Sequence, residues 1–210
     1  MIKNANCIFR KDTLILLLCL LFCACQPIAR LIYGVKKPRE VSTQKIEKKA
    51  VELDIDTSAL FAIRSEYYPK VINEVKSFPN IRIYDKAGNM YNYRENPEEC
   101  KSTADDFIQN LRLDSAYNYV NDSSFFRLPL QLEGLRGEQF NIEALREADF
   151  YAFIFWATFL GKMNKDNVIP RTRLAKENRR AKIHLIYISC DLRDEWGDDY
   201  WKSWGPPPAK

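Results

Sequence analysis

The sequence predicts an α/β fold in which helices flank a mixed central sheet of about five strands. Residues 150–157 and 182–190 are near-continuous apolar runs of strand length, which is typical of strands buried on both faces. Residues 78–93 contain two alternating segments around a turn with Gly88, which is the pattern of a β-hairpin. Segments with helical spacing of apolar residues separate these strands, so helices and strands are expected to pack in layers around one core.

The first half of the folded region predicts helices and strands in alternation. In the second helix, Tyr67, Val71 and Val75 are expected to share the face that packs on the core. Ser102 or Thr103 is suited to cap the start of the third helix. The expected order is helix, strand, helix, hairpin and helix, at residues 41–53, 59–63, 66–75, 78–93 and 105–111.

The N-terminus has the pattern of a signal peptide, assigned to residues 1–24. Basic residues precede an apolar run at 14–22, which is too short to cross a bilayer because spanning takes about 20 residues. Ala24 then precedes Cys25, and this pair resembles a lipobox, in which the cysteine after the cleavage site is diacylated. We therefore expect lipid at Cys25 and an extracytoplasmic domain anchored to a membrane of the bacterial cell envelope. An uncleaved anchor and a signal peptide without lipid are the alternatives.

Composition and charge indicate one domain on a tether. Removing 24 residues from 210 leaves 186, and the formal net charge falls from +4 to +2. This balance lacks the clustered positive charge of nucleic-acid-binding domains, so no nucleic-acid partner is expected. Residues 25–42 are expected to form the lipidated terminus and a basic tether that favours anionic headgroups, residues 43–195 the domain, and residues 196–210 an aromatic, proline-rich tail.

The end of the strand at 150–157 resembles the active-site segment of a known family. Residues 155–163 are similar to the Phe-Trp-Ala-Thr-Trp-Cys-Gly-Pro-Cys signature of membrane-tethered, thioredoxin-like disulfide reductases. Leu160 and Met163 stand at the two cysteine positions, and Lys162 stands where the signature has proline. Neither replacement can form the mixed disulfide of thiol exchange. No catalytic residue, cofactor or metal is therefore expected at residues 159–163, here called the relic loop.

The resemblance implies a thioredoxin-like sandwich with a permuted element order. Residues 59–111 are similar to the strand, helix, proline, hairpin and helix that end such a domain, whereas residues 126–190 are similar to its beginning. Pro79 stands where the family has a cis-proline beside the active-site loop. The implied sheet order, with its first three strands parallel to one another, is 59–63, 182–190, 150–157, 80–86 and 90–93.

The function implied by the resemblance is binding rather than catalysis. Thioredoxin-like domains hold extended peptides in a groove beside the cis-proline, and the loss of the cysteines leaves that groove in place. Trp156, Phe159, Met163 and Phe78 are candidates to line it, with core positions as the alternative, and a core position is favoured for Trp156 and Phe78. A surface of methionine and aromatic side chains suits a peptide or an envelope protein as ligand. The candidate site comprises Trp156, Phe159, Leu160, Gly161, Lys162, Met163, Phe78 and Pro79.

The alternative function is that of an atypical thiol oxidoreductase using Cys100 or Cys190. A reactive thiolate needs exposure and neighbouring positive charge, but Cys100 follows Glu98 and Glu99, and Cys190 precedes Asp191. The implied strand order places the two cysteines on opposite sides of the sheet. Because a disulfide requires Cα atoms within about 7 Å, we expect none between them.

Other candidate residues favour structural roles. His184 is the only histidine, so a zinc site would need an unusual ligand set, and a structural imidazole is expected. Lys162 is expected to be an exposed lysine rather than a nucleophile. The basic stretch 170–182 is expected to be a solvated face, with binding to an anionic partner or to the headgroups beneath the anchor as the alternative. The aromatic residues at 196–204 either cover an apolar patch or form a docking surface.

Overall fold

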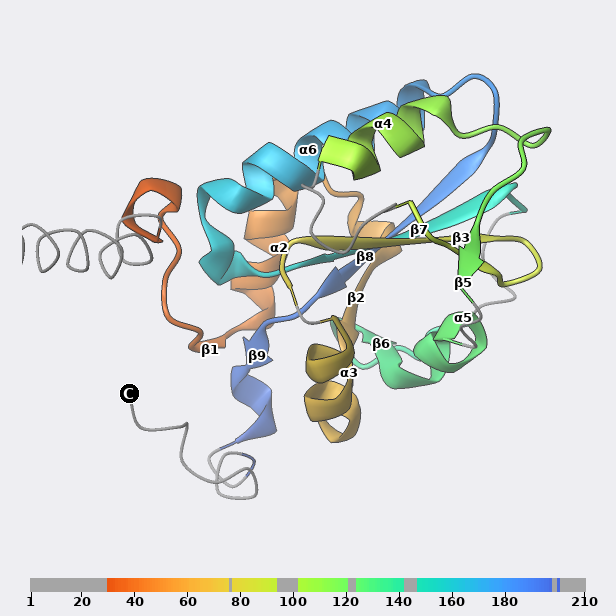
Figure 1. Cartoon of the computed structure of the whole chain (residues 1–210). Helices are drawn as coiled ribbons and strands as arrows, with labels where there is room; N and C mark the ends of the chain where they lie inside the picture. The colour runs from red at the N-terminus through yellow and green to blue at the C-terminus, as the bar shows by residue number, and fades with distance from the viewer. Residues whose placement is uncertain are drawn as a thin grey trace, which may run out of the picture.

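The computed structural model describes residues 30–75, 77–93, 102–120, 124–141, 147–197 and 200. The strands of its main sheet are β2 (Leu60–Ile63), β3 (Asn80–Asp85), β4 (Met90–Tyr91), β5 (Tyr119–Val120), β6 (Leu132–Gly134), β7 (Phe150–Trp156) and β8 (Ile183–Ser189). They lie in the order β5, β4, β3, β7, β8, β2, β6 (Figure 1). A separate parallel pair joins β1 (Glu40–Val41) to β9 (Leu192–Arg193).

The middle of the sheet has the strand order that the resemblance implied. β2 and β7 each pair in parallel with β8, whereas β3 runs antiparallel to both β7 and β4. The prediction of an α/β fold with a mixed sheet is therefore confirmed. The predicted strand count of about five is too low, because β5 and β6 extend the two edges of the sheet.

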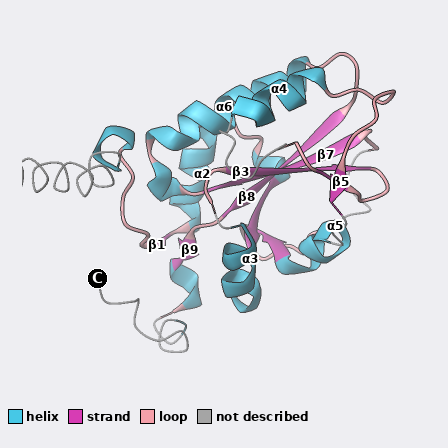
Figure 2. Ribbon diagram, in the orientation of Figure 1, coloured by secondary structure: helices cyan, strands magenta, loops and turns pink. Residues whose placement is uncertain are grey.

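Helices cover both faces of the sheet (Figure 2). Helices α2 (Thr43–Glu52), α4 (Ser102–Asn110) and α6 (Lys162–Glu177) pack on one face, whereas α3 (Tyr68–Val75) and α5 (Ser124–Arg127) pack on the other. Strand β7 supplies Ile154 and Trp156 to the first core and Phe153 and Phe155 to the second. Its continuous apolar run is thus explained by burial on both sides.

The two edge strands are too short to leave a pattern in the sequence. Residues 126–140 had been expected only to lead into the first long strand, but they contain the end of α5, a 3-10 turn at Leu128–Gln131 and β6. β6 pairs antiparallel with β2, and β5 pairs antiparallel with β4. A strand of two or three residues shows no alternation, so only its tertiary partner identifies it.

Three helix starts differ from the predicted ones by two or three residues. α2 begins at Thr43 because Val41 belongs to β1. In the second predicted helix, Tyr68 faces the core in place of Tyr67, which ends the preceding 3-10 turn. α4 begins at Ser102 and so includes the residue that had been expected to cap it. Among the helices described, none is long and apolar enough to cross a membrane.

The basic stretch 170–182 is only partly a solvated face. Arg171 is 2% exposed, and its Nε donates to Oδ1 of Asp105 at 3.0 Å, which joins α6 to α4. The prediction of a solvated side chain is therefore wrong for Arg171, because the neighbouring helix supplies a carboxylate. The exposed members of the stretch are Arg173, Lys176, Arg179, Arg180 and Lys182.

Candidate functional site

The two predicted halves of the site lie at the same end of the sheet. β7 leads through a 3-10 turn at Thr158–Leu160 into α6. The β3–β7 register pairs Asn80 with Phe155, so Pro79 lies opposite Trp156 when the register is continued by one residue. The peptide bond before Pro79 is cis, as the resemblance implied. The fold thus places the proline segment beside the end of the strand that carries the relic loop.

Not all the residues expected to line a groove are available to a ligand. Phe78, Phe159 and Met163 are partly buried and pack on the core beneath α3. Trp156 is completely buried in the core on the opposite face of the sheet, because alternate residues of a strand point to opposite faces. Leu160 is also buried. The inclusion of Trp156 among the groove candidates is therefore wrong, because it occupies the core position that was favoured for it.

Two other residues of the predicted site differ in exposure: Pro79 is buried, whereas Lys162 is exposed. Pro79 is buried, so it shapes the site without offering surface. Lys162 is the first residue of α6, and its Nζ lies 4.0 Å from a carboxylate oxygen of Asp166. The side chain is exposed, as expected, although it belongs to a helix rather than to a loop.

Part of the predicted tether folds back over the relic loop. We call residues 33–41 the strap. The Lys36 N–H donates to the carbonyl oxygen of Phe159 at 2.8 Å, and β1 at the end of the strap pairs with β9. Gly161 has a φ of 55°, and a Cβ there would collide with the carbonyl oxygen of Tyr33. The close approach requires a residue without a side chain, so Gly161 is fitted to receive the strap.

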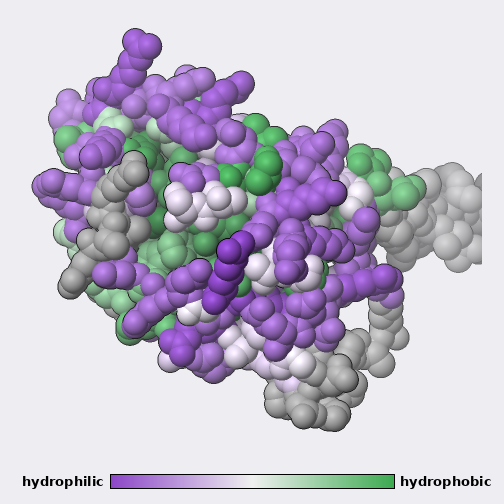
Figure 3. Space-filling view, turned by 180° about the vertical axis from the view of Figure 1, so that it is seen from behind, coloured by the Kyte–Doolittle hydropathy of each residue, from purple (hydrophilic) through white to green (hydrophobic). Residues whose placement is uncertain are grey.

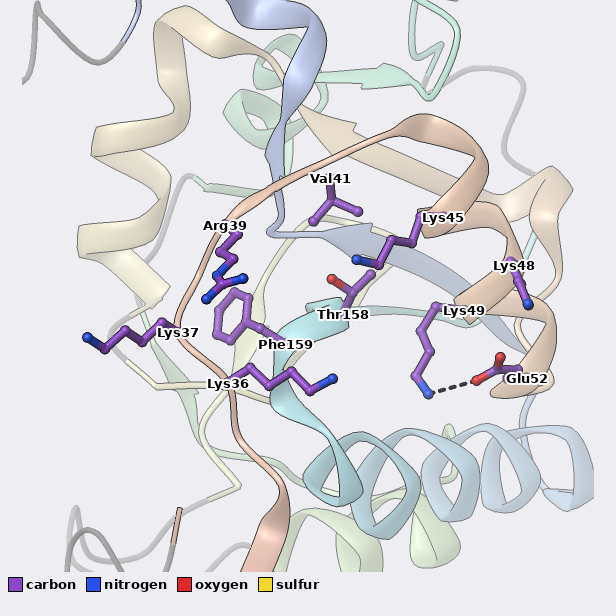
Figure 4. Close-up of a pocket in the computed structure, with 10 residues that line it drawn as sticks. All are labelled: Lys36, Lys37, Arg39, Val41, Lys45, Lys48, Lys49, Glu52, Thr158 and Phe159. Atoms are coloured by element: carbon purple, nitrogen blue, oxygen red, sulfur yellow. Dashed lines mark hydrogen bonds and ion pairs between the residues drawn. The ribbon is translucent and has the colours of Figure 1, made fainter. Parts of the chain in front are cut away.

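A basic pocket, here called the strap pocket, lies between the strap and α2 (Figure 4). Its volume is about 780 Å³, which is within the range of ligand sites. Thr158 and Phe159 lie between its two walls, and Lys36 and Lys45 reach from opposite walls toward the space beside Thr158, whereas Lys37 points away. The cationic residues that line the pocket are Lys36, Lys37, Arg39, Lys45, Lys48 and Lys49.

The positive charge of the strap pocket is nearly uncompensated. Glu52 is its one acidic lining residue, and Lys49 Nζ donates to a Glu52 carboxylate oxygen at 2.8 Å. This hydrogen bond and the charge of Lys49 lower the pKa of Glu52, so the acid stays ionised and paired. No ion pair joins the other five cations to a carboxylate within the described ranges. The pocket is thus suited to an anion.

Asp191 holds the turn at the end of β7. Its carboxylate accepts the Thr158 N–H at 2.9 and 3.0 Å, the Thr158 hydroxyl at 2.6 Å and the Ser189 hydroxyl at 2.9 Å. Burial raises the pKa of Asp191, and these hydrogen bonds together with the charge of Lys45 offset part of the increase. The carboxylate therefore fixes Thr158, which separates the two walls of the strap pocket.

Asp191→Asn is expected to make stability less dependent on pH. The pKa of Asp191 in the folded chain lies above its ordinary value of 3.8, so protonation favours folding. That stabilisation is present below pH 3.8 and is lost as the pH rises through the folded pKa. Asparagine keeps an acceptor for Thr158 but does not ionise. The unfolding free energy of the variant minus that of wild type should therefore increase as the pH rises. It should become constant once Asp191 is fully ionised in the folded protein.

Urea denaturation at a series of pH values from about 4 to 8 measures this difference. Asp114→Asn is the control, because Asp114 is exposed and pairs only at the surface with Arg112. If the Asp191→Asn difference were independent of pH, or increasingly favoured wild type, the raised pKa would be contradicted.

Cys190 is unsuited to thiol chemistry. It is a free, buried cysteine, and desolvation followed by the charge of Asp191 raises its pKa well above the ordinary value. The Tyr68 hydroxyl donates to its carbonyl oxygen at 3.0 Å, which packs α3 against the end of β8. The expected absence of a disulfide between Cys190 and Cys100 stays a prediction. Cys100 lies outside the described residues.

The remaining candidates occupy structural positions. His184 lies in β8 with its ring centroid 6.1 Å from that of Tyr151. No cluster of three or more His, Cys, Asp or Glu residues within the described part of the chain is arranged to hold a metal.

The described part of the tail packs back on the domain. The Trp196 ring lies 5.2 Å from Tyr68 and 4.8 Å from Tyr200, measured between centroids. The Tyr200 hydroxyl donates to the carbonyl oxygen of Ser65 at 3.0 Å. Trp196 and Tyr200 had two expected roles, to cover an apolar patch of the domain or to form a docking surface. These contacts favour the first. The tail residues after Tyr200 lie outside the described residues.

The strap pocket is the part of the site that the sequence reasoning missed. Its cations belong to the predicted tether and to the predicted amphipathic helix at 41–53, and no pattern in the sequence indicates that these two elements face each other. A signal was nevertheless present, because the basic residues at 36, 37, 39, 45, 48 and 49 are dense and face few acids in the sequence. Residues 1–29, which include Cys25, lie outside the described residues, so the signal peptide and the lipid stay predictions.

Comparisons with protein-family models, with characterised proteins and with solved structures give no match to this chain.

Proposed function

We propose that this chain is a lipid-anchored protein of the bacterial envelope whose thioredoxin-like domain binds a peptide or protein segment without redox chemistry. Acyl chains on Cys25 hold the domain at a membrane, outside the cytoplasm. The domain is a circular permutant in this proposal, because β2, α3 and the β3–β4 hairpin precede β7 in the chain, whereas the family has the strand before its active-site loop first.

Support for the fold assignment comes from the arrangement of strands and helices. β2, β8, β7, β3 and β4 are neighbours in the order that the resemblance implied. α6 follows the relic loop and packs with α4 on one face, whereas α3 covers the other. The cis peptide bond before Pro79 and the position of Pro79 opposite the end of β7 agree with the same assignment.

The observation that carries the binding function is that the relic loop already holds an extended segment. The strap contacts it through main-chain atoms, from the Lys36 N–H to the carbonyl oxygen of Phe159 at 2.8 Å. Main-chain pairing with an added extended segment is a general mode of peptide recognition. Met163 packs on the same core as Phe159 and keeps part of its surface exposed, so it is the residue of the relic loop that a partner can contact.

The residues at the relic loop weigh against thiol exchange. Leu160 and Met163 offer no thiol, and Cys190, the one cysteine in the described ranges, is buried with a raised pKa. A thiolate nucleophile needs exposure and net stabilisation of its charge. Cys190 is buried, and desolvation together with the charge of Asp191 outweighs the favourable charge of Arg82.

Photocrosslinking in living cells tests the binding function. A photoreactive phenylalanine analogue at Met163 is expected to form a covalent adduct with an envelope protein. The same analogue at Leu113 is the control, because Leu113 is exposed near the far end of α6, where Asn178 hydrogen-bonds the carbonyl of Leu111. No adduct from Met163 in cells where Cys25 is acylated would contradict the binding role.

Two other results would overturn parts of the proposal. Mass spectra showing Cys25 without acyl chains would remove the anchor. Thiol-exchange activity that is abolished by Cys100→Ser or Cys190→Ser would favour the oxidoreductase instead.

A further inference from the structure

We infer that the strap pocket binds the phosphate of an anionic lipid headgroup, so that the strap and α2 form a second, electrostatic attachment to the membrane. The inference rests on the proposed acylation of Cys25, which brings this end of the domain to the bilayer. It adds a defined pocket, with a second wall from α2, to the basic tether that is expected to favour anionic headgroups.

The distance along the chain places the strap at the membrane. Five peptide steps separate Cys25 from Arg30, and each spans at most about 3.6 Å, so Arg30 lies within about 18 Å of the acylated residue. The strap follows directly, and its Lys36 lines the pocket. The strap pocket is therefore lined by residues that lie close in the chain to the proposed point of attachment.

An exposed apolar turn precedes the pocket. Residues 30–33 are helical, and Leu31, Ile32 and Tyr33 are 82, 64 and 39% exposed. Seen from behind, apolar surface lies at the edge of the molecule where the described chain begins, and other apolar areas lie among hydrophilic side chains toward the middle of that face (Figure 3). Apolar side chains next to a group of lysines are typical of segments that lie at a membrane interface.

The chemistry of the pocket selects for charge. Six cations and one acid line the pocket. That acid is paired with Lys49, and the buried Asp191 carboxylate beside Thr158 interacts with Lys45. The Thr158 hydroxyl donates to Asp191, so its proton is not free for a ligand. Recognition thus depends on ammonium and guanidinium groups, which bind a phosphate oxyanion by charge-assisted hydrogen bonds. A zwitterionic headgroup carries its own compensating cation and is the weaker ligand.

The relic loop maintains the shape of this pocket. Its carbonyl at Phe159 accepts the Lys36 N–H, and the bare Cα of Gly161 lets the strap approach closely. These two contacts fix the wall that carries Lys36 and Arg39 opposite the wall formed by α2. The relic loop, which has no cysteines, thereby keeps the headgroup site in shape.

Lysine acetylation of the membrane-purified, lipidated chain tests the inference. The protein is reconstituted in vesicles of phosphatidylcholine, with or without phosphatidylglycerol, and the acetylation rate of each lysine is read by mass spectrometry. Phosphatidylglycerol is expected to slow acetylation of Lys36, Lys45 and Lys49 about fivefold, the factor that about 1 kcal/mol per charge near an anionic surface implies. The rates at Lys70 and Lys86, which are exposed on α3 and at the hairpin turn, are expected to stay unchanged.

A charge-removing pair of variants sharpens the test. Lys36→Gln with Lys45→Gln is expected to return the acetylation rate of Lys49 to its value in phosphatidylcholine. The matched control, Lys70→Gln with Lys86→Gln, is expected to leave the protection of Lys49 intact.

Each remaining outcome overturns the inference. Equal protection of all lysines would show general screening by the surface. Equal protection by glycerol 3-phosphate added to phosphatidylcholine vesicles would identify a soluble phosphate ester as the ligand. Unprotected pocket lysines on a chain with acylated Cys25 would refute the headgroup site alone, whereas an unacylated Cys25 would refute the anchor and the inference together.

Discussion

Arg193→Ala is expected to lower the free energy of unfolding by about 3 kcal/mol. The Arg193 side chain is 2% exposed, and its guanidinium forms ion pairs with Glu133 of β6, at 2.5 Å, and with Glu195. It also donates to the carbonyl oxygen of Leu135 at 2.6 Å. Alanine removes these charge-assisted bonds and leaves a cavity where β9 meets β6. The loss should also loosen the strap, because β1 pairs with β9.

The matched control is Arg136→Ala. The Arg136 side chain is 72% exposed and pairs with Glu47 at 3.1 Å. An exposed ion pair of this kind contributes at most about 1 kcal/mol. Urea denaturation of both variants at neutral pH measures the two losses. If both variants lost the same small amount of stability, the structural role given to Arg193 would be wrong.

The sequence predicted the elements whose patterns extend over five or more residues. The apolar runs at 150–157 and 182–190 identified β7 and β8, and the alternation around Gly88 identified the β3–β4 hairpin. These signals are strong because burial of the whole strand imposes them on consecutive residues. β5 and β6 show no such apolar pattern, because each has only two or three residues and lies at an edge of the sheet.

The candidate site was only partly predictable, because its polar contacts join residues far apart in the sequence. Asp191 receives the Thr158 N–H from 33 residues away, and Arg171 meets Asp105 from 66 residues away. Periodicity carries no information about such partners. The resemblance brought Pro79 and the relic loop together correctly. It included Trp156 among the groove candidates, but the core position favoured for this residue is the one that the structure shows.

The strap escaped prediction for a related reason. Residues 33–41 contain few apolar side chains, so nothing in their composition indicates burial. Their main contacts with the domain are made by the backbone, through the Lys36 N–H and the pairing of β1 with β9. Backbone contacts of this kind impose little on the sequence of the segment that makes them. They restrict the sequence of the relic loop more strongly, because the close approach of the strap requires glycine at position 161.

Gly161→Ala is therefore expected to displace the strap as well as destabilise the fold. Gly161 has φ 55° and ψ −126°, a region that side chains disfavour at a cost of about 1–3 kcal/mol. The added Cβ would also collide with the carbonyl oxygens of Tyr33 and Gly34. These are main-chain atoms, so the collision is relieved only when the strap moves. Trypsin should then cleave after Lys36 and Arg39 faster than in wild type.

Gly137→Ala separates the two effects. Gly137 also has a positive φ, of 87°, but a Cβ there meets no atom within 4 Å. This control should lose stability through backbone strain alone and should keep the wild-type rate of cleavage in the strap. Limited proteolysis followed by mass spectrometry compares the three proteins at the same temperature. Equal cleavage rates in the two glycine variants would mean that residue 161 does not hold the strap in place. The relic loop would then have no role in positioning the segment that leads to the membrane.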